Sequence, residues 1–314
     1  MNPNNIIETL RKRSVKSCFG MASFNDPWLI WKRRIEAILD NGYSASAILG
    51  LGDHLSEIFL TTKDSSSALS GRPQSTLSRA GNAWEGLVCW YLNLCLIGSR
   101  SVAIRVKSDL PMPLRDAICV SYENSISNTE SDLTIVTFPE KDCFIGSIAN
   151  TIKGDRSNLQ KFINQQTENF FHNFEVGIVQ CKTNWRDNSQ IPMLWNLIYS
   201  AKKDFNAGIP VGRNNFSIRH LKKFTYSFCT VPTGGLKDFT PTSMPVKRVK
   251  SLSGGNYWGR KTTDGVARSI REIFNTNLSN SFLEVSQRTL INEASRQLAD
   301  ALSYFDIALD DYKS

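Results

Sequence analysis

The first hundred residues carry hydrophobic side chains at helical spacing, which predicts a helical N-terminal region. Asp26 and Pro27 predict the beginning of one helix and Gly42 its end, because Asp is a favoured N-cap, proline fits the first helical turn and glycine commonly follows a helix end. A second helix is expected from Ser44 or Ser46 to about residue 60. The apolar face of the first helix is formed by the residues at positions 28, 31, 35, 38 and 39.

A longer apolar segment follows a polar stretch at 61–71. It predicts a helix from about residue 73 to residue 97, ending before Gly98. The second half of this segment, AWEGLVCWYLNLCLIG, is apolar nearly all round, which is typical of a helix that is buried on every side.

Beyond residue 100 the pattern changes to short runs rich in β-branched and aromatic residues, interleaved with helical segments. We therefore expect an α/β protein, with a central mixed β-sheet flanked by helices and further helices at both ends of the chain. Strands are expected at 102–106, 117–121, 132–138, 175–182 and 224–231. Helices are expected at about 158–171, 190–205, 264–277 and 284–309.

This order of elements divides the chain into three parts of one compact domain. Residues 1–70 form a helical region that packs on the core. Residues 71–232 form the core itself, with an insertion at 140–173 between two of its strands. Residues 233–314 form a basic loop region, rich in Pro, Gly, Ser and Thr, followed by the C-terminal helices.

The composition excludes several classes of protein. With 41% hydrophobic and 21% charged residues, the chain is neither disordered nor fibrous. No apolar run is long enough to cross a membrane, so no membrane partner is expected. The basic N-terminus lacks the apolar segment of a signal peptide.

The spacing of the cysteines, histidines and glycines argues against several further kinds of site. The seven cysteines include no CxxC pair, so neither a disulfide framework nor a zinc site is expected, and a reducing cytoplasm is the expected location. The three histidines are isolated from one another, and no local pattern supports a nucleophile pair. No glycine-rich phosphate loop is present, so no nucleotide cofactor is expected.

Positive charge is concentrated in one part of the chain. The formal net charge is +8, from 37 Lys and Arg against 29 Asp and Glu. Residues 202–271 alone hold 14 Lys and Arg against three acids, a net charge of +11. Such an excess favours a polyanionic partner, with nucleic acid first among them, over the alternative of a solvated surface without a ligand.

Polar residues stand at the ends of two of the predicted, otherwise apolar strands. Asp132 opens an otherwise apolar strand, and Gln180 and Lys182 close another. A spacing of two places the Gln180 and Lys182 side chains on the same face. If these two strands pair, the three residues meet at one edge of the sheet. Singly, each has an ordinary explanation: a turn residue for the acid, a surface lysine for the base.

This pattern resembles the PD-(D/E)xK nuclease superfamily. Ser131-Asp132 matches the "PD" step, and Gln180-Cys181-Lys182 matches the "(D/E)xK" step. Glu85 fits the glutamate that many members carry on a helix before the first motif strand. Within the superfamily the chain looks most like a type II restriction endonuclease, from its size and its basic C-terminal part. It departs from the family pattern by Ser in place of Pro, and by Gln in place of an acid.

The resemblance implies a restriction-endonuclease-like core at 71–232 and Mg²⁺-dependent, site-specific hydrolysis of phosphodiester bonds in double-stranded DNA. Asp132 would be the main metal ligand, Glu85 a second carboxylate, and the Cys181 backbone carbonyl and the Gln180 amide oxygen neutral ligands. Lys182 would orient the attacking water. Because such enzymes cut both strands, the resemblance also implies a homodimer.

DNA contacts are expected in two segments. Just past the catalytic lysine, side chains suited to base edges are Arg186, Asp187, Asn188 and Gln190. Further along, side chains suited to the phosphate backbone are Lys247, Arg248, Lys250, Arg260 and Lys261. The alternatives are a solvated loop with helix-capping residues for the first segment, and for the second a glycine-rich turn anchored to the core by Tyr257 and Trp258.

Two other functions stay open. One is a structure-specific repair or recombination nuclease with the same fold, which would recognise the shape of the nucleic acid. The other is a noncatalytic DNA-binding protein with a degenerate nuclease site. Gln180, which replaces the family's acid, is the residue that favours the second alternative.

Overall fold

The structure is a computed structural model of the 314-residue chain. It describes residues 4–39, 44–62, 74–122, 125–128, 131–147, 156–183, 211–231, 240–244, 246–247, 257–258, 273–274, 278, 287–289, 291, 293 and 302–307. Statements about the fold refer to these residues.

Five helical elements form the N-terminal region: α1 (Ile6–Phe19), α2 (Ala22–Leu39), α3 (Ala45–Gly50), the 3-10 helix η1 (Leu51–His54) and α4 (Leu55–Leu60). Sequence reasoning did not predict α1. The single helix expected over 44–60 is divided into three, although Ser44 caps it as expected, accepting a hydrogen bond from the Ala47 N–H at 3.1 Å.

Helix α2 begins four residues before the predicted N-cap, so Pro27 lies inside the helix. The reason is the position of Phe24, which is fully buried and stacks on Trp28 with ring centroids 5.3 Å apart. Phe24, Trp28, Trp31 and Ile35 form one buried stripe at helical spacing. Burying Phe24 stabilises the extra turn by about 1.5–3 kcal/mol, comparable with the roughly 3 kcal/mol that an interior proline costs.

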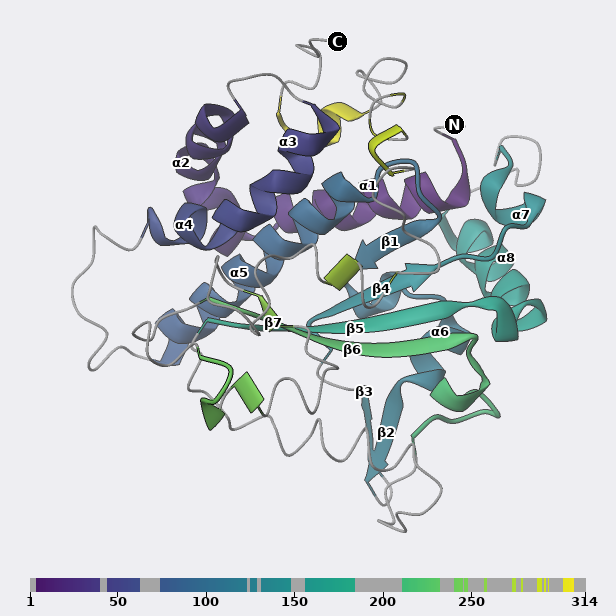
Figure 1. The fold of residues 1–314 in the computed structure, drawn as a ribbon. Coiled ribbons are helices and arrows are strands. Elements are labelled where there is room, and N and C mark those ends of the chain that lie inside the picture. The colour runs from purple at the N-terminus through teal and green to yellow at the C-terminus, as the bar shows by residue number, and fades with distance from the viewer. Residues whose placement is uncertain are drawn as a thin grey trace.

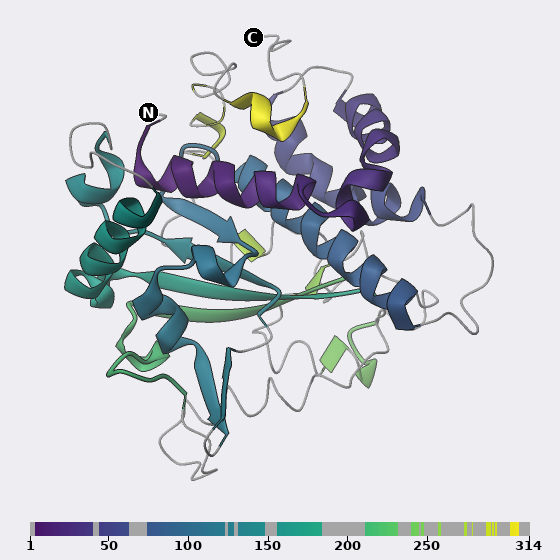
Figure 2. The same ribbon diagram turned by 180° about the vertical axis from the view of Figure 1, so that it is seen from behind.

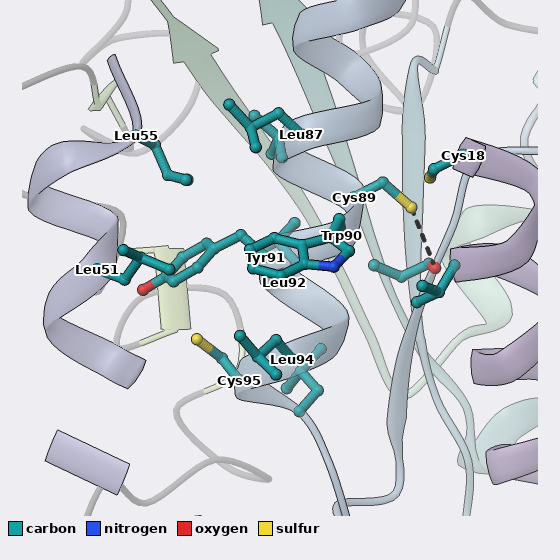
Figure 3. Packing of buried hydrophobic residues seen from close by; sticks show 14 of the residues in the cluster. Cys18, Leu51, Leu55, Leu87, Cys89, Trp90, Tyr91, Leu92, Leu94 and Cys95 are labelled. Atoms are coloured by element: carbon teal, nitrogen blue, oxygen red, sulfur yellow. Dashed lines mark hydrogen bonds between the residues drawn. The ribbon is translucent and has the colours of Figure 1, made fainter. Parts of the chain in front are cut away.

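Helix α5 (Gln74–Cys95) matches the predicted helix and packs between the N-terminal helices and the sheet, in contact with α1, α2, β1 and β5. Its Trp90 and Tyr91 are fully buried, and each donates a hydrogen bond to a backbone carbonyl: Trp90 Nε1 to Phe305 at 3.0 Å and Tyr91 Oη to Leu49 at 2.7 Å. Figure 3 shows the Tyr91 ring reaching toward Leu51 of η1. The polar ends of these aromatic side chains therefore join α5 to segments far away in the sequence.

The main sheet has five strands in the order β1 (Ser101–Ile104), β4 (Leu133–Thr137), β5 (Glu175–Lys182), β6 (Lys223–Thr230) and β7 (Tyr257–Trp258). The pairs β1–β4 and β4–β5 are antiparallel, whereas β5–β6 and β6–β7 are parallel. This confirms the prediction of an α/β fold with a central mixed sheet. A separate hairpin, β2 (Cys119–Tyr122) with β3 (Ser125–Asn128), projects away from the sheet (Figure 1).

Each face of the sheet contributes to a different hydrophobic core. One face packs against α5 and the N-terminal helices through residues such as Leu133, Ile135 and Val179. The other face packs against α6 (Met112–Ala117) and α8 (Arg156–Asn169) through residues such as Val136 and Ile178. Figure 2 shows α1 and α5 lying next to each other along the first of these layers.

The segment between β4 and β5 holds α7 (Asp142–Ile145), α8 and the 3-10 helix η4 (Phe171–Asn173). The sequence predicted an insertion here with one helix at about 158–171, which corresponds to α8. The remaining short elements are the 3-10 helices η2 (Lys107–Asp109), η5 (Ile218–His220) and η7 (Ser303–Phe305). The seven cysteines all lie within the described residues, and none of them forms a disulfide bond. Among the described residues, no helix is both long and apolar enough to cross a membrane.

The C-terminal predictions are met only in part. The helix expected over 284–309 does not continue to its predicted end, because residues 303–305 are a 3-10 turn and Asp306 has a left-handed backbone with φ of 54°. The Asp306 carboxylate accepts a hydrogen bond from Trp28 Nε1 at 2.6 Å and pairs with Lys32 at 3.1 Å. The helix predicted at 190–205 lies outside the described residues.

Two glycines of α5 allow a test of this packing. At Gly86, an added Cβ would stand 2.6 Å from Cδ2 of Phe24, a ring already held by Trp28. We expect Gly86→Ala to lower the free energy of unfolding by about 1–3 kcal/mol through overpacking. At Gly81 nothing lies within 4 Å, so Gly81→Ala should raise it by about 0.5–1 kcal/mol. Urea unfolding measures both, and shifts in the same direction would contradict this view of the α2–α5 contact.

Candidate active site at the edge of the sheet

The strand directions bring the predicted motif residues to one edge of the main sheet. Strands β4 and β5 are antiparallel neighbours with Leu133 opposite Val179, so Asp132, one residue before β4, lies opposite Gln180. The beginning of β4 and the end of β5 therefore share an edge. The pairing on which the sequence interpretation depended is present.

The Asp132 carboxylate is held by β5. Its Oδ2 accepts a hydrogen bond from Gln180 Nε2 at 2.8 Å and a second from the backbone N–H of Cys181 at 2.6 Å. The ladder between the two strands ends at Leu133, so at the next paired position the Cys181 N–H meets a side-chain carboxylate instead of a backbone carbonyl. Hydrogen bonds to an ionised acceptor are about twice as strong as neutral ones, which keeps this carboxylate in one orientation.

The Gln180 side chain is buried and bonded at both ends of its amide. Its nitrogen donates to Asp132, and its Oε1 accepts a hydrogen bond from Tyr226 Oη at 2.9 Å. A carboxylate can only accept, so the amide nitrogen must face Asp132 and the oxygen must face away. This differs from the expectation that the Gln180 oxygen is a metal ligand. In the structure, Gln180 positions the carboxylate.

The side chain and the backbone of Cys181 lie in different surroundings. Its thiol lies on the opposite face of the sheet, in the core shared with Cys229 on β6. Burial raises the pKa of this thiol well above its ordinary value, and the neighbouring Cys229 raises it further. The backbone carbonyl of Cys181 points to the same side of β5 as its N–H, which is toward Asp132. The carbonyl, and not the sulfur, is therefore the group available to a cation here.

Glu85 reaches the same edge from α5. The residue before it, Trp84, donates its indole N–H to the Cys229 carbonyl at 3.4 Å, which ties this turn of the helix to β6. Burial raises the pKa of the Glu85 carboxyl above its usual value. The positive charges of Arg105, Lys182 and Lys107 oppose this rise of the pKa, and the effect of Arg105 is the largest. Glu85 and Lys182 are thus close enough to interact.

Three residues of this edge were missed by sequence reasoning. Arg105 and Lys107 follow β1 directly, and an Arg-x-Lys step after a strand is the signal that could have found them. Tyr226 lies within β6, two residues before the partner of Gln180, where its long side chain reaches diagonally across the sheet. Only the order of the strands reveals its role.

Most of the predicted DNA contacts lie outside the described residues. This holds for Arg186, Asp187, Asn188, Gln190, Arg248, Lys250, Arg260 and Lys261. Lys247 is described, and its side chain is exposed. Tyr257 and Trp258 form β7 and pair with Phe228 and Cys229, as in the alternative that these aromatic residues anchor the glycine-rich segment to the core.

One part of the basic segment, for which we expect a polyanionic partner, lies far from the candidate site. Strand β6 is parallel to β5, so residues just before β6 lie where β5 begins, about 23 Å along the strand from Lys182. There Lys222 pairs with Glu175 at 2.8 Å. Arg213, also before β6, pairs with Asp116 at 2.6 Å. Residues 211–223 are therefore not part of a DNA-binding surface next to Lys182.

The oxygen atoms at this edge suit a hard cation. Mg²⁺ is commonly bound by one or two carboxylates together with water and substrate phosphate. Asp132 and Glu85 supply two carboxylates, and Cys181 supplies a backbone carbonyl. Within the described part of the chain, no group of three or more His, Cys, Asp or Glu side chains is placed to hold a metal, so the carbonyl is needed to complete such a set.

No known protein family and no curated protein matches this chain.

The Tyr226 hydrogen bond can be tested by its effect on stability. Tyr226→Phe removes the bond to Gln180, and we expect the free energy of unfolding to fall by about 0.5–1.5 kcal/mol. Tyr304→Phe is the matched control, because the Tyr304 hydroxyl is buried without a hydrogen-bond partner among the described residues. Thermal unfolding should show a loss for the first variant and none for the second. Equal losses would mean that the Tyr226 hydroxyl has no special role.

Proposed function

We propose that this protein is a Mg²⁺-dependent endonuclease that hydrolyses phosphodiester bonds of double-stranded DNA at specific sites, as a type II restriction enzyme does. The observation that carries the proposal is the Asp132 carboxylate, held by Gln180 and Cys181 at the edge where β4 begins and β5 ends. A lysine two residues after Gln180 and a glutamate from α5 reach the same edge, in the order that the resemblance implied.

Each residue has a separate task in this reaction. Asp132, Glu85 and the Cys181 carbonyl would hold Mg²⁺, which supplies charge neutralisation at the phosphate and lowers the pKa of a bound water. Lys182 orients the attacking water and offers a positive charge to the phosphate oxygens. Gln180 keeps Asp132 in the ligating orientation, and Tyr226 keeps Gln180 in place.

We also propose that the active form is a homodimer. A duplex presents two scissile bonds related by a two-fold axis, so two copies of the site, related in the same way, can cut both strands.

A second candidate function is favoured by the orientation of the Gln180 amide. In place of a carboxylate, the site has an amide nitrogen facing Asp132, so one negative charge and one oxygen ligand are lost from the metal site. A protein with this change would bind DNA through the same cations without cutting it.

Cleavage products distinguish these functions. Purified protein is incubated with long duplex DNA and Mg²⁺, and the ends of the products are sequenced. We expect discrete fragments that share an end sequence. Cuts found only at flaps or junctions would instead indicate a structure-specific nuclease. Binding without cleavage in either Mg²⁺ or Mn²⁺ would overturn the nuclease proposal and favour the noncatalytic function.

Two variants test the assignment of the site. Asp132→Asn and Lys182→Met should each lower the cleavage rate by about 10²–10⁴-fold. The asparagine keeps the fold, because both hydrogen bonds end on one oxygen and an amide oxygen can accept both. Lys222→Met, at the far end of β6, removes a lysine without touching the site and should leave the rate unchanged. Melting curves check that all three variants are folded, and wild-type cleavage by Asp132→Asn would contradict the assignment.

A further inference from the structure

Two cations that the motif does not contain lie at the same edge of the sheet. Strand β1 is antiparallel to β4 and β4 is antiparallel to β5, so β1 runs parallel to β5. Ile104, the last residue of β1, is opposite Thr134, which in turn is opposite Ile178 of β5. Arg105 and Lys107 therefore leave β1 where Asp132 enters β4.

These cations act on the same carboxyl group as Lys182. All three positive charges lie close enough to the Glu85 carboxyl to interact with it, and the interaction with Arg105 is the largest. We call Glu85, Arg105, Lys107, Asp132 and Lys182 the edge cluster. Its net charge is +1 when all five groups are ionised, and a divalent cation bound by the two carboxylates would raise this to +3. A cluster of this charge favours an anionic ligand.

The Arg105 side chain has a donor that the described residues do not use. Its Nε is buried without a hydrogen-bond partner among them. The basic residues before β6 differ, because Arg213 and Lys222 are each paired with a carboxylate. A buried guanidinium donor without an acceptor is unfavourable, and an anionic oxygen arriving at this edge would satisfy it.

We propose that Arg105 and Lys107 each bind one of the backbone phosphates of duplex DNA next to the phosphate that is cut. The proposal rests on the proposed function, since it takes the same edge of the sheet as the place where DNA lies. Arg105 offers the planar, two-pronged donor set that matches a phosphate, and Lys107 offers a point charge beside it. Each cation adds one phosphate contact to those made by Lys182.

The salt dependence of DNA binding tests this proposal. Binding of a short, fluorescently labelled duplex of mixed sequence is measured by anisotropy at several salt concentrations, with Ca²⁺ in place of Mg²⁺. Each phosphate contact contributes about 0.9 to the slope of log K against log salt concentration. We expect Arg105→Gln and Lys107→Gln each to reduce the steepness of the slope by about that amount, and the double variant to reduce it by about twice as much.

Two further variants separate charge from structure. Lys222→Gln removes one charge at the opposite end of the sheet and should leave the slope as in the wild type. Arg105→Lys keeps the charge but loses the two-pronged geometry, so it should keep the wild-type slope and bind more weakly. If melting shows that Arg105→Gln does not fold, the phosphate contacts are tested by the salt slope of Lys107→Gln and by the affinity of Arg105→Lys.

The outcomes also separate this proposal from the nuclease proposal. Slopes for Arg105→Gln and Lys107→Gln equal to that of the wild type would overturn the phosphate contact, even if the wild type cuts DNA. A wild type that does not bind the duplex would overturn it as well. A wild type that binds with the expected slopes but never cuts in Mg²⁺ or Mn²⁺ would leave the phosphate contact standing and refute the nuclease function.

Discussion

The candidate site depends on one contact, between the Asp132 carboxylate and the two N–H groups that β5 offers it. This contact exists because β4 begins one residue after Asp132, which leaves the Cys181 N–H without a backbone partner on that strand. A carboxylate supplied from the neighbouring strand satisfies that donor. The end of a β-ladder, normally a place of unpaired backbone groups, thereby becomes a rigid acceptor site.

The orientation of Gln180 and its hydrogen bond to Tyr226 follow from this contact. Because Asp132 can only accept, the Gln180 amide has a single favourable orientation, and that orientation presents its oxygen to the Tyr226 hydroxyl. Side-chain hydrogen bonds therefore run from Asp132 at the beginning of β4, through Gln180 of β5, to Tyr226 of β6, in addition to the backbone pairing of these strands. In the proposed metal site, Gln180 in place of an acid removes one ligand and holds Asp132 in position instead. More of the metal binding would then fall on Glu85 and the Cys181 carbonyl.

Sequence reasoning predicted the class of fold and the meeting of Asp132 with Gln180, because strand alternation determines which side chains share a face. It missed α1, since Glu8 and Arg11 are buried as an ion pair and interrupt the apolar stripe by which a helix is recognised. It expected the basic segment at 202–271 to face a polyanion but could not show that residues 211–223 lie far from Lys182, because nothing in a strand's own residues says whether it runs parallel to its neighbour. Tyr226, Arg105 and Lys107 were missed because their nearness to Asp132 depends on the order of the strands in the sheet.

The contacts of the last described residues bear on how the chain is made. Phe305 belongs to the core around α5, its carbonyl accepts the Trp90 indole N–H, and Asp306 accepts that of Trp28. The N-terminal helices are synthesised before residues 302–307, yet their core includes side chains from this later segment. Domains commonly fold as units during synthesis. Here the helical layer cannot complete its core until residues 302–307 have emerged from the ribosome.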